Sequence, residues 1–182
     1  MQRHVAFLRG MNLGNRRIGN EELRREFEAL GFAGVACFRA SGNVIFDDEG
    51  GDEDELGGRI EAGLAEALGY EVPVFLRSAA ELGEIAAREP FEAAAVAASK
   101  GKLQVAFLAS APPGDDSERA LALATDEDRL AIEGRELHWL PSGGISKSAL
   151  DLSALESILG TWTMRTRGTV EQIVAKYCGA EV

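Results

Sequence analysis

Histidine and cysteine are scarce in this chain. Two of its 182 residues are Cys and two are His, and no C-x-x-C pair occurs. A structural zinc site usually needs three or four such ligands at short spacing, so we expect no metal, and nothing in the sequence indicates a cofactor. The apolar neighbours of Cys37 favour a buried thiol, and they leave open whether it pairs with Cys178.

Long apolar runs are absent as well. No stretch approaches the ~20 residues that span a bilayer, and the run Val5–Leu8 is too short for a signal peptide. These absences predict a cytoplasmic protein with reduced thiols and no membrane partner. The formal net charge of −11 disfavours nucleic acid as a partner, because an acidic protein repels a polyanion.

The first 77 residues carry the pattern of one small α+β domain. Leu23, Phe27 and Leu30 recur at helical spacing between apolar runs that favour strands. Pro73 indicates an edge strand or the start of a strand, because proline cannot donate a ladder hydrogen bond. The order β-α-β-β-α-β is typical of the ferredoxin-like fold. The expected elements are strand 4–9, helix 20–30, strands 35–39 and 44–47, helix 56–68 and strand 72–76.

The opening strand recurs a hundred residues later, because Val105–Leu108 repeats Val5–Leu8 identically as Val-Ala-Phe-Leu. Both copies are therefore expected to be buried central strands. The predicted fold class is α+β, a duplication of two ferredoxin-like βαββαβ halves with extra C-terminal helices. After the second copy we expect helix 117–124, a hairpin of strands 129–132 and 136–140, and helices near 148–159 and 169–177. The predicted parts are a first half at 1–77, a helical connector at 78–101 and a second half at 102–182.

Four polar stretches are candidate binding loops. Residues 8–14 form a glycine-rich strand-to-helix connection, where backbone N–H groups can approach a ligand. Residues 40–43 and 142–148 are further connections, and the second lacks the Gly-Lys-Ser spacing of a P-loop. Residues 161–169 hold two Arg and no acid beside an expected helix N-terminus. The alternative is that these stretches are ordinary turns, which the residues of 40–43 taken alone favour, and that the arginines of the first and last stretches are solvated.

These stretches, in this order, resemble the markers of the bacterial domain-of-unknown-function family 1697. The family's Leu-Arg-Gly-Ile-Asn-Val-Gly resembles residues 8–14, and its Gln-Ser-Gly-Asn-Val resembles residues 40–44. A Ser-Lys pair after a glycine-containing turn is similar to residues 146–147, and Thr-Thr-Arg-Asn-Trp-x-Thr is similar to residues 163–169. The resemblance covers nearly the whole chain and implies two ferredoxin-like halves. It implies no reaction, because the activity of the family is not established.

Besides conservative apolar exchanges in the first marker, four residues depart from these markers. Ala40 stands for Gln, Met164 for Thr, Thr166 for Asn and Arg167 for Trp. The departures leave open whether the C-terminal part of a family site persists in this chain.

The function we predict is the binding of a small anionic, phosphate-bearing ligand in a cleft between the halves. Positive charge gathers near the first polar loop, since residues 1–25 hold six Arg against two Glu. Cationic side chains would neutralise the ligand, and amides and hydroxyls would orient it. The candidate ligand-binding residues are Arg9, Asn12, Ser41, Asn43, Lys147, Arg165 and Thr169.

Two placements follow from this prediction. Arg9, Asn12, Ser41 and Asn43 should share one neighbourhood, because the end of the first strand and the turn 40–43 can reach the same sheet edge. Arg165 should point with Lys147 into one concave surface.

Other functions stay open. No Ser-His-Asp, Cys-His or paired-carboxylate arrangement is visible, so the sequence does not decide whether the protein is an enzyme. A nucleic-acid-binding module on a ferredoxin-like sheet is one alternative, although the RNP1 pattern is missing. A structural or regulatory domain that binds a protein partner is another. The oligomeric state is not indicated by the sequence.

Overall fold

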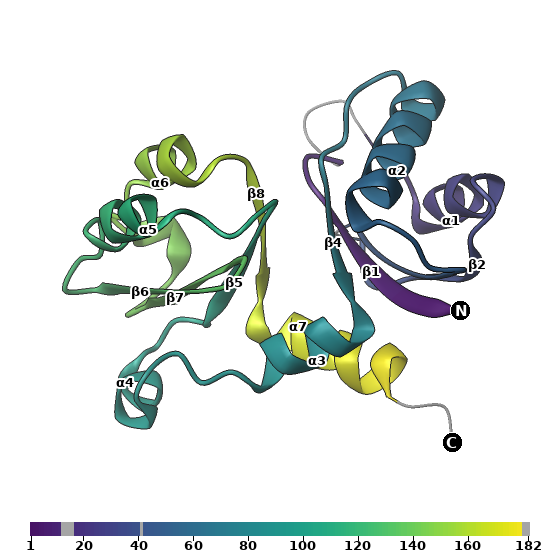
Figure 1. Cartoon of the computed structure of the whole chain (residues 1–182). Coiled ribbons are helices and arrows are strands. Elements are labelled where there is room, and N and C mark those ends of the chain that lie inside the picture. The colour runs from purple at the N-terminus through teal and green to yellow at the C-terminus, as the bar shows by residue number, and fades with distance from the viewer. Residues whose placement is uncertain (12–16, 41, 180–182) are drawn as a thin grey trace. The chain divides into compact units, whose positions relative to one another are not determined.

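The computed structural model describes residues 1–11, 17–40 and 42–179. The chain divides into two units (Figure 1). One is Met1–Ile85 together with the segment that begins at Ile173, and the other is Ala86–Gln172. The first half of the chain contains β1 (Gln2–Leu8), α1 (Asn20–Ala29), β2 (Ala33–Cys37), β3 (Asn43–Asp48), α2 (Glu53–Leu68), β4 (Val74–Ser78) and α3 (Ala79–Ala87). The rest contains α4 (Ala93–Ala98), β5 (Gln104–Leu108), α5 (Gly114–Leu121), β6 (Asp128–Glu133), β7 (Glu136–Pro141), a 3-10 turn (Ile145–Lys147), α6 (Leu152–Leu159), β8 (Trp162–Thr166), α7 (Arg167–Ile173) and a π-helix (Val174–Cys178).

Each unit is built on a four-stranded antiparallel sheet, and the two sheets have the same strand order. The orders are β2-β3-β1-β4 and β6-β7-β5-β8. Val5–Leu8 and Val105–Leu108 therefore lie in interior strands, and both segments are buried, as their identical sequence predicts. β4 lies at an edge of its sheet, in agreement with Pro73 directly before it.

The register of the strands repeats as well. Val5 pairs with Arg77 across β1 and β4, and Val105 pairs with Arg165 across β5 and β8. The duplication therefore includes an arginine on the edge strand next to each interior strand. β8 is a strand where the sequence predicted a polar loop. Its alternation of Trp162 and Met164 with polar residues suits a strand with one apolar and one polar face.

The repeat continues into the helix after each of these edge strands. The backbone N–H of Glu81 donates to Ser78 Oγ at 3.2 Å at the start of α3. The backbone N–H of Thr169 donates to Thr166 Oγ1 at 3.2 Å at the start of α7. Each hydroxyl accepts from a first-turn N–H, a group that has no acceptor within its own helix, and so caps the helix. α7 thus corresponds in the second repeat to α3, and α4 lies within the unit Ala86–Gln172.

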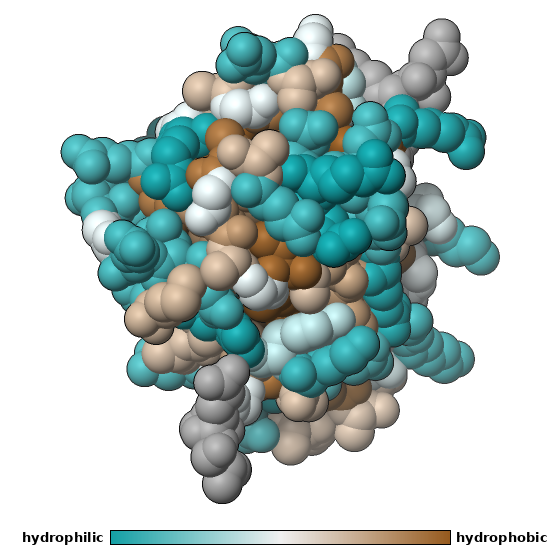
Figure 2. Space-filling view, turned by 90° about the vertical axis from the view of Figure 1, so that its right-hand side faces the viewer, coloured by the Kyte–Doolittle hydropathy of each residue, from teal (hydrophilic) through white to brown (hydrophobic). Residues whose placement is uncertain are grey.

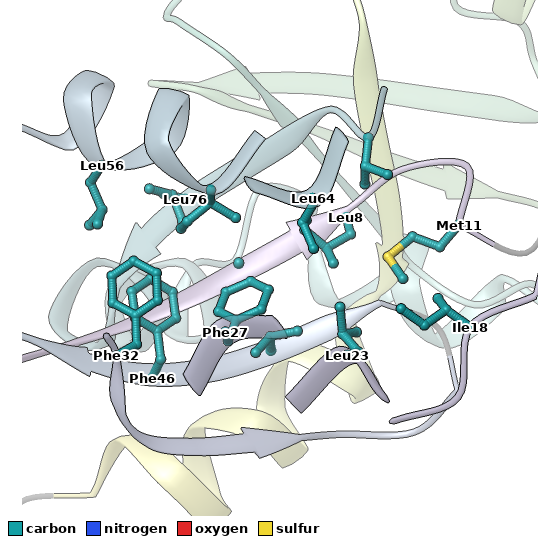
Figure 3. Packing of buried hydrophobic residues seen from close by; sticks show 14 residues of the cluster. Leu8, Met11, Ile18, Leu23, Phe27, Phe32, Phe46, Leu56, Leu64 and Leu76 are labelled. Atoms are coloured by element: carbon teal, nitrogen blue, oxygen red, sulfur yellow. The ribbon is translucent and has the colours of Figure 1, made fainter. Parts of the chain in front are cut away.

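One face of the first sheet is covered by α1 and α2, and a hydrophobic cluster fills the space between them (Figure 3). Phe27, Phe32 and Phe46 pack together there, with Phe32 and Phe46 ring centroids 4.5 Å apart. Tilted aromatic contacts at such distances stabilise a core beyond simple area burial. Met11 and Ile18 lie at the other end of the cluster, beside Leu8.

The second sheet has its own cluster on the α5 and α6 side, which includes Leu137, Trp139 and Leu155. A buried carboxylate ties this side together. Asp128 Oδ1 accepts from Trp139 Nε1 and from Ser148 Oγ, both at 2.8 Å, and its Oδ2 accepts from Thr125 Oγ1 at 3.0 Å. A buried carboxylate with three donors is satisfied and therefore structural.

No helix in the described part of the chain is both long enough and apolar enough to cross a membrane. In the view of Figure 2, hydrophilic side chains cover much of the surface and smaller apolar areas show between them.

Candidate functional site

In the first unit, the end of β1 lies against the turn that joins β2 and β3. The Leu8 N–H donates to Gly42 O at 2.8 Å, and the Arg9 N–H donates to Pro73 O at 3.0 Å. Gly42 has φ +69°, and a Cβ there would stand 3.0 Å from Leu8 Cβ. A side chain at this position would be both strained and crowded, so the turn requires glycine. This explains in physical terms the glycine of the Ser-Gly-Asn stretch.

Asn43 is fully buried at this turn. Its Nδ2 donates to Phe38 O at 2.9 Å, and the Phe38 N–H donates to Asn43 O at 2.9 Å. The amide therefore closes the turn between β2 and β3. Arg9 is half-buried next to the same turn, so these two candidates share a neighbourhood, whereas Asn12 and Ser41 lie outside the described residues.

In the second unit, Lys147 is exposed in the connection that follows β7. It lines a cavity of about 150 Å³ together with Glu127, Asp128 and Ser148. Two carboxylates in the wall make this cavity a poor place for a further anion. Lys147 thus lies on the β6–β7 side of the sheet.

Arg165 lies on β8, at the opposite edge of the same sheet. The structure therefore does not bring Arg165 and Lys147 into one concave surface. The Arg165 guanidinium is half-buried, and its Nη1 donates to Thr163 Oγ1 at 2.9 Å and to Met164 O at 2.8 Å. Burial lowers its pKa to about 10, because a desolvated cation is less stable than a hydrated one.

Thr169 is buried and takes part in the cap of α7. Its N–H donates to Thr166 Oγ1, and the two hydroxyls lie 2.9 Å apart. Arg167 Nε donates to Glu171 Oε1 at 2.9 Å, one helical turn further on. Two hydroxyls and one arginine of the acid-free stretch, those of Thr166, Thr169 and Arg167, thus form hydrogen bonds within α7 or at its start.

Sequence reasoning missed His138, which shares a sheet face with Arg165. Both residues pair with Val105, from opposite sides, so they point to the face that α5 and α6 leave uncovered. His138 is 1% exposed, and neither ring nitrogen has a hydrogen-bond partner among the described residues. Burial lowers the pKa of His138, against the opposing effect of nearby carboxylates.

Glu136 and Thr163 flank Phe107 on the same face, one step further along the strands. Glu136 is buried, and its Oε2 accepts from Arg88 Nη1 at 2.5 Å. Buried ionisable groups in register on one sheet face are typical of functional sites, although structural ion pairs also produce them. We call Glu136, His138, Thr163 and Arg165 the polar face of the second sheet. The alternation of polar and apolar residues in Glu-Leu-His-Trp at 136–139 is the sequence signal from which Glu136 and His138 could have been placed on one face.

Metal and thiol chemistry find little support in the residues that the structure describes. No group of three or more His, Cys, Asp or Glu side chains there could hold a metal ion. Cys37 and Cys178 are both free and half-buried, and burial raises the pKa of each thiol. Cys37 packs against the first hydrophobic cluster but is only partly buried, whereas its apolar sequence neighbours predicted a buried thiol.

The comparisons with known proteins agree with this fold. The conserved bacterial protein SP0830 from Streptococcus pneumoniae has a similar structure, with a TM-score of 0.70 at 17% sequence identity, over 96% of this chain and 97% of that one. No curated protein matches the chain. The family described as "Protein of unknown function (DUF1697)" matches residues 1–138, which include the first two markers and end before Lys147 and Arg165. Because this match spans most of the sequence, the chain belongs to the DUF1697 family.

Proposed function

We propose that the protein binds a small anionic ligand through Arg165, on the polar face of the second sheet. The observation that carries the proposal is the environment of the guanidinium. It is half-buried, it is held by the neutral acceptors Thr163 Oγ1 and Met164 O, and burial lowers its pKa to about 10. A cation that has already lost part of its hydration gains more from an anion than a fully hydrated one does, because the local dielectric is low.

The chemistry of the group favours an oxyanion. A guanidinium offers a planar fork of N–H donors that matches phosphate and carboxylate oxygens. Since Nη1 is fixed by Thr163 and Met164, the side chain is oriented before any ligand arrives. The net charge of −11 favours a small ligand over a polymer, because repulsion grows with the number of phosphates brought to the surface.

A thermal-shift titration tests this proposal. Inorganic phosphate, adenosine monophosphate and a sugar phosphate are added in turn to the wild type and to R165Q and R165K. A ligand that binds only the folded state raises the melting temperature. A charge-assisted contact contributes about 1.5–3 kcal/mol, so R165Q should bind roughly 10- to 150-fold more weakly, with R165K in between.

The matched control is R119Q. Arg119 is an exposed arginine of the same unit, and it forms an ion pair with Asp116 on the surface. This variant should bind like the wild type. Absence of stabilisation by all three anions, or equal stabilisation of R165Q and the wild type, would contradict the proposal.

A further inference from the structure

Helix α4 is apolar along its whole length yet has no buried face. Its sequence is Ala-Ala-Ala-Val-Ala-Ala, none of its residues is buried, and Val96 is 40% exposed. An apolar helix normally packs its side chains against a core, since burial of apolar surface is the main source of its stability. Here the space beside the helix is a cavity of about 260 Å³, bordered by Phe91, Val96, Ala97 and Leu103.

One of the residues that line this cavity is a cation, Arg167. Arg167 is 24% exposed, its Nε donates to Glu171, and its Nη2 donates to Ala86 O at 3.3 Å. The hydrogens on Nη1 find no acceptor among the described residues. Glu89 also lines the cavity and is exposed. Its carboxylate disfavours a second negative charge on an occupant.

We infer that this cavity binds a small monocarboxylate with an aromatic or branched apolar body, whose carboxylate meets Arg167. The volume fits such a body, because an apolar cavity of about 150 Å³ already accommodates benzene. The apolar walls contact the body, and the two Nη1 hydrogens face the carboxylate. The occupant supplies the buried contact that α4 otherwise lacks. The inference is independent of the proposed function, because none of its residues belongs to the polar face of the second sheet.

Isothermal titration with benzoate tests the inference, with benzamide as the uncharged analogue. Two variants of α4 separate the cavity from the helix. Ala94 and Ala97 are both exposed on this helix, but only Ala97 lines the cavity. A97F places a ring into the cavity and should abolish benzoate binding, whereas A94F should bind like the wild type. Since both positions are at the surface, both variants should fold, which circular dichroism checks.

R167Q tests the charge. It should weaken benzoate binding about tenfold, which corresponds to 1.4 kcal/mol, and leave benzamide binding unchanged. Benzoate that does not bind at millimolar concentration overturns the inference. Binding that survives A97F overturns the location, and binding that R167Q leaves unchanged overturns the assignment of the carboxylate to Arg167. None of these results bears on phosphate binding at Arg165, which is read with different probes.

Discussion

Replacing Asp128 by Ala should destabilise the second unit more than any nearby surface change. The carboxylate is 1% exposed and accepts hydrogen bonds from Trp139, Ser148 and Thr125. Trp139 is 2% exposed, so its Nε1–H would lose its acceptor without access to water. Thr125 is exposed and Ser148 half-buried, so both hydroxyls can turn to solvent. One stranded donor and one lost charge-assisted bond cost about 2–4 kcal/mol together.

Urea unfolding followed by tryptophan fluorescence measures this loss. The control is D126A, which alters an exposed acid two residues away and should change the free energy of unfolding by less than about 0.5 kcal/mol. D128N keeps an acceptor for Trp139 and should lose about half as much as D128A. In a double-mutant cycle, W139F should recover part of the loss, because it removes the stranded donor. A D128A variant within about 1 kcal/mol of D126A would refute the reasoning.

Three further predictions follow from single residues. G101A should unfold at a lower urea concentration than the control variant G143A. A Cβ on Gly101 would overlap the carbonyl oxygens of Gly143 and Pro141, whereas a Cβ on Gly143 would meet no atom within 4 Å. Equal unfolding midpoints of the two variants would exclude this crowding. Burial lowers the pKa of His138 below 6.5, so the unfolded chain binds the proton more readily, and urea titrations should show full stability above pH 6.5 and a loss as the pH falls below it. H138L should flatten that decline, and an unchanged slope would argue against a neutral imidazole. K147Q should bind phosphate as the wild type does in the thermal-shift assay, because Lys147 lines a cavity with two carboxylates; a tenfold loss would restore it as a ligand residue.

The fold could be predicted from the sequence largely because of one repeat. Val5–Leu8 and Val105–Leu108 are identical and occupy the same place in two equally ordered sheets. Local signals such as Pro73 and the helix end at Gly69 also agree with the structure, where Gly69 has φ +75°. These signals are local or exact repeats, which are the features that a single sequence displays most clearly.

β8 could not be predicted as a strand from the sequence, for a physical reason. The strand Trp162–Thr166 is short, is polar at every second position and is directly followed by a helix, so its sequence resembles that of a loop. When β8 is aligned with β4, however, both strands end in the same pattern, an apolar residue, an arginine and a hydroxyl residue. These are residues 76–78 in β4 and residues 164–166 in β8. A strand of this kind is stabilised by partners that are distant in the sequence. The residues of β8 alone therefore do not determine its pairing with β5.

The candidate site could be predicted only in part. The end of β1 lies against the turn before Asn43, as the sequence predicted, because β1 pairs with β3 and the turn between β2 and β3 is short. It could not separate Lys147 from Arg165, since their distance depends on the order of four strands. It also could not show that the Thr169 hydroxyl lies beside the capping hydroxyl of Thr166, because capping and ligand-binding hydroxyls both occur at a helix N-terminus.

The most direct test of the proposed function observes the Arg165 guanidinium itself. Its Nε–Hε signal, assigned by its disappearance in R165K, is followed by nuclear magnetic resonance while inorganic phosphate is titrated into the wild-type protein. We predict a saturable shift of this signal at phosphate concentrations that leave the Nε–Hε signal of Arg119 in place. A signal of Arg165 that stays unchanged up to saturating phosphate, or that moves only together with the exposed arginines, would contradict anion binding on the polar face of the second sheet.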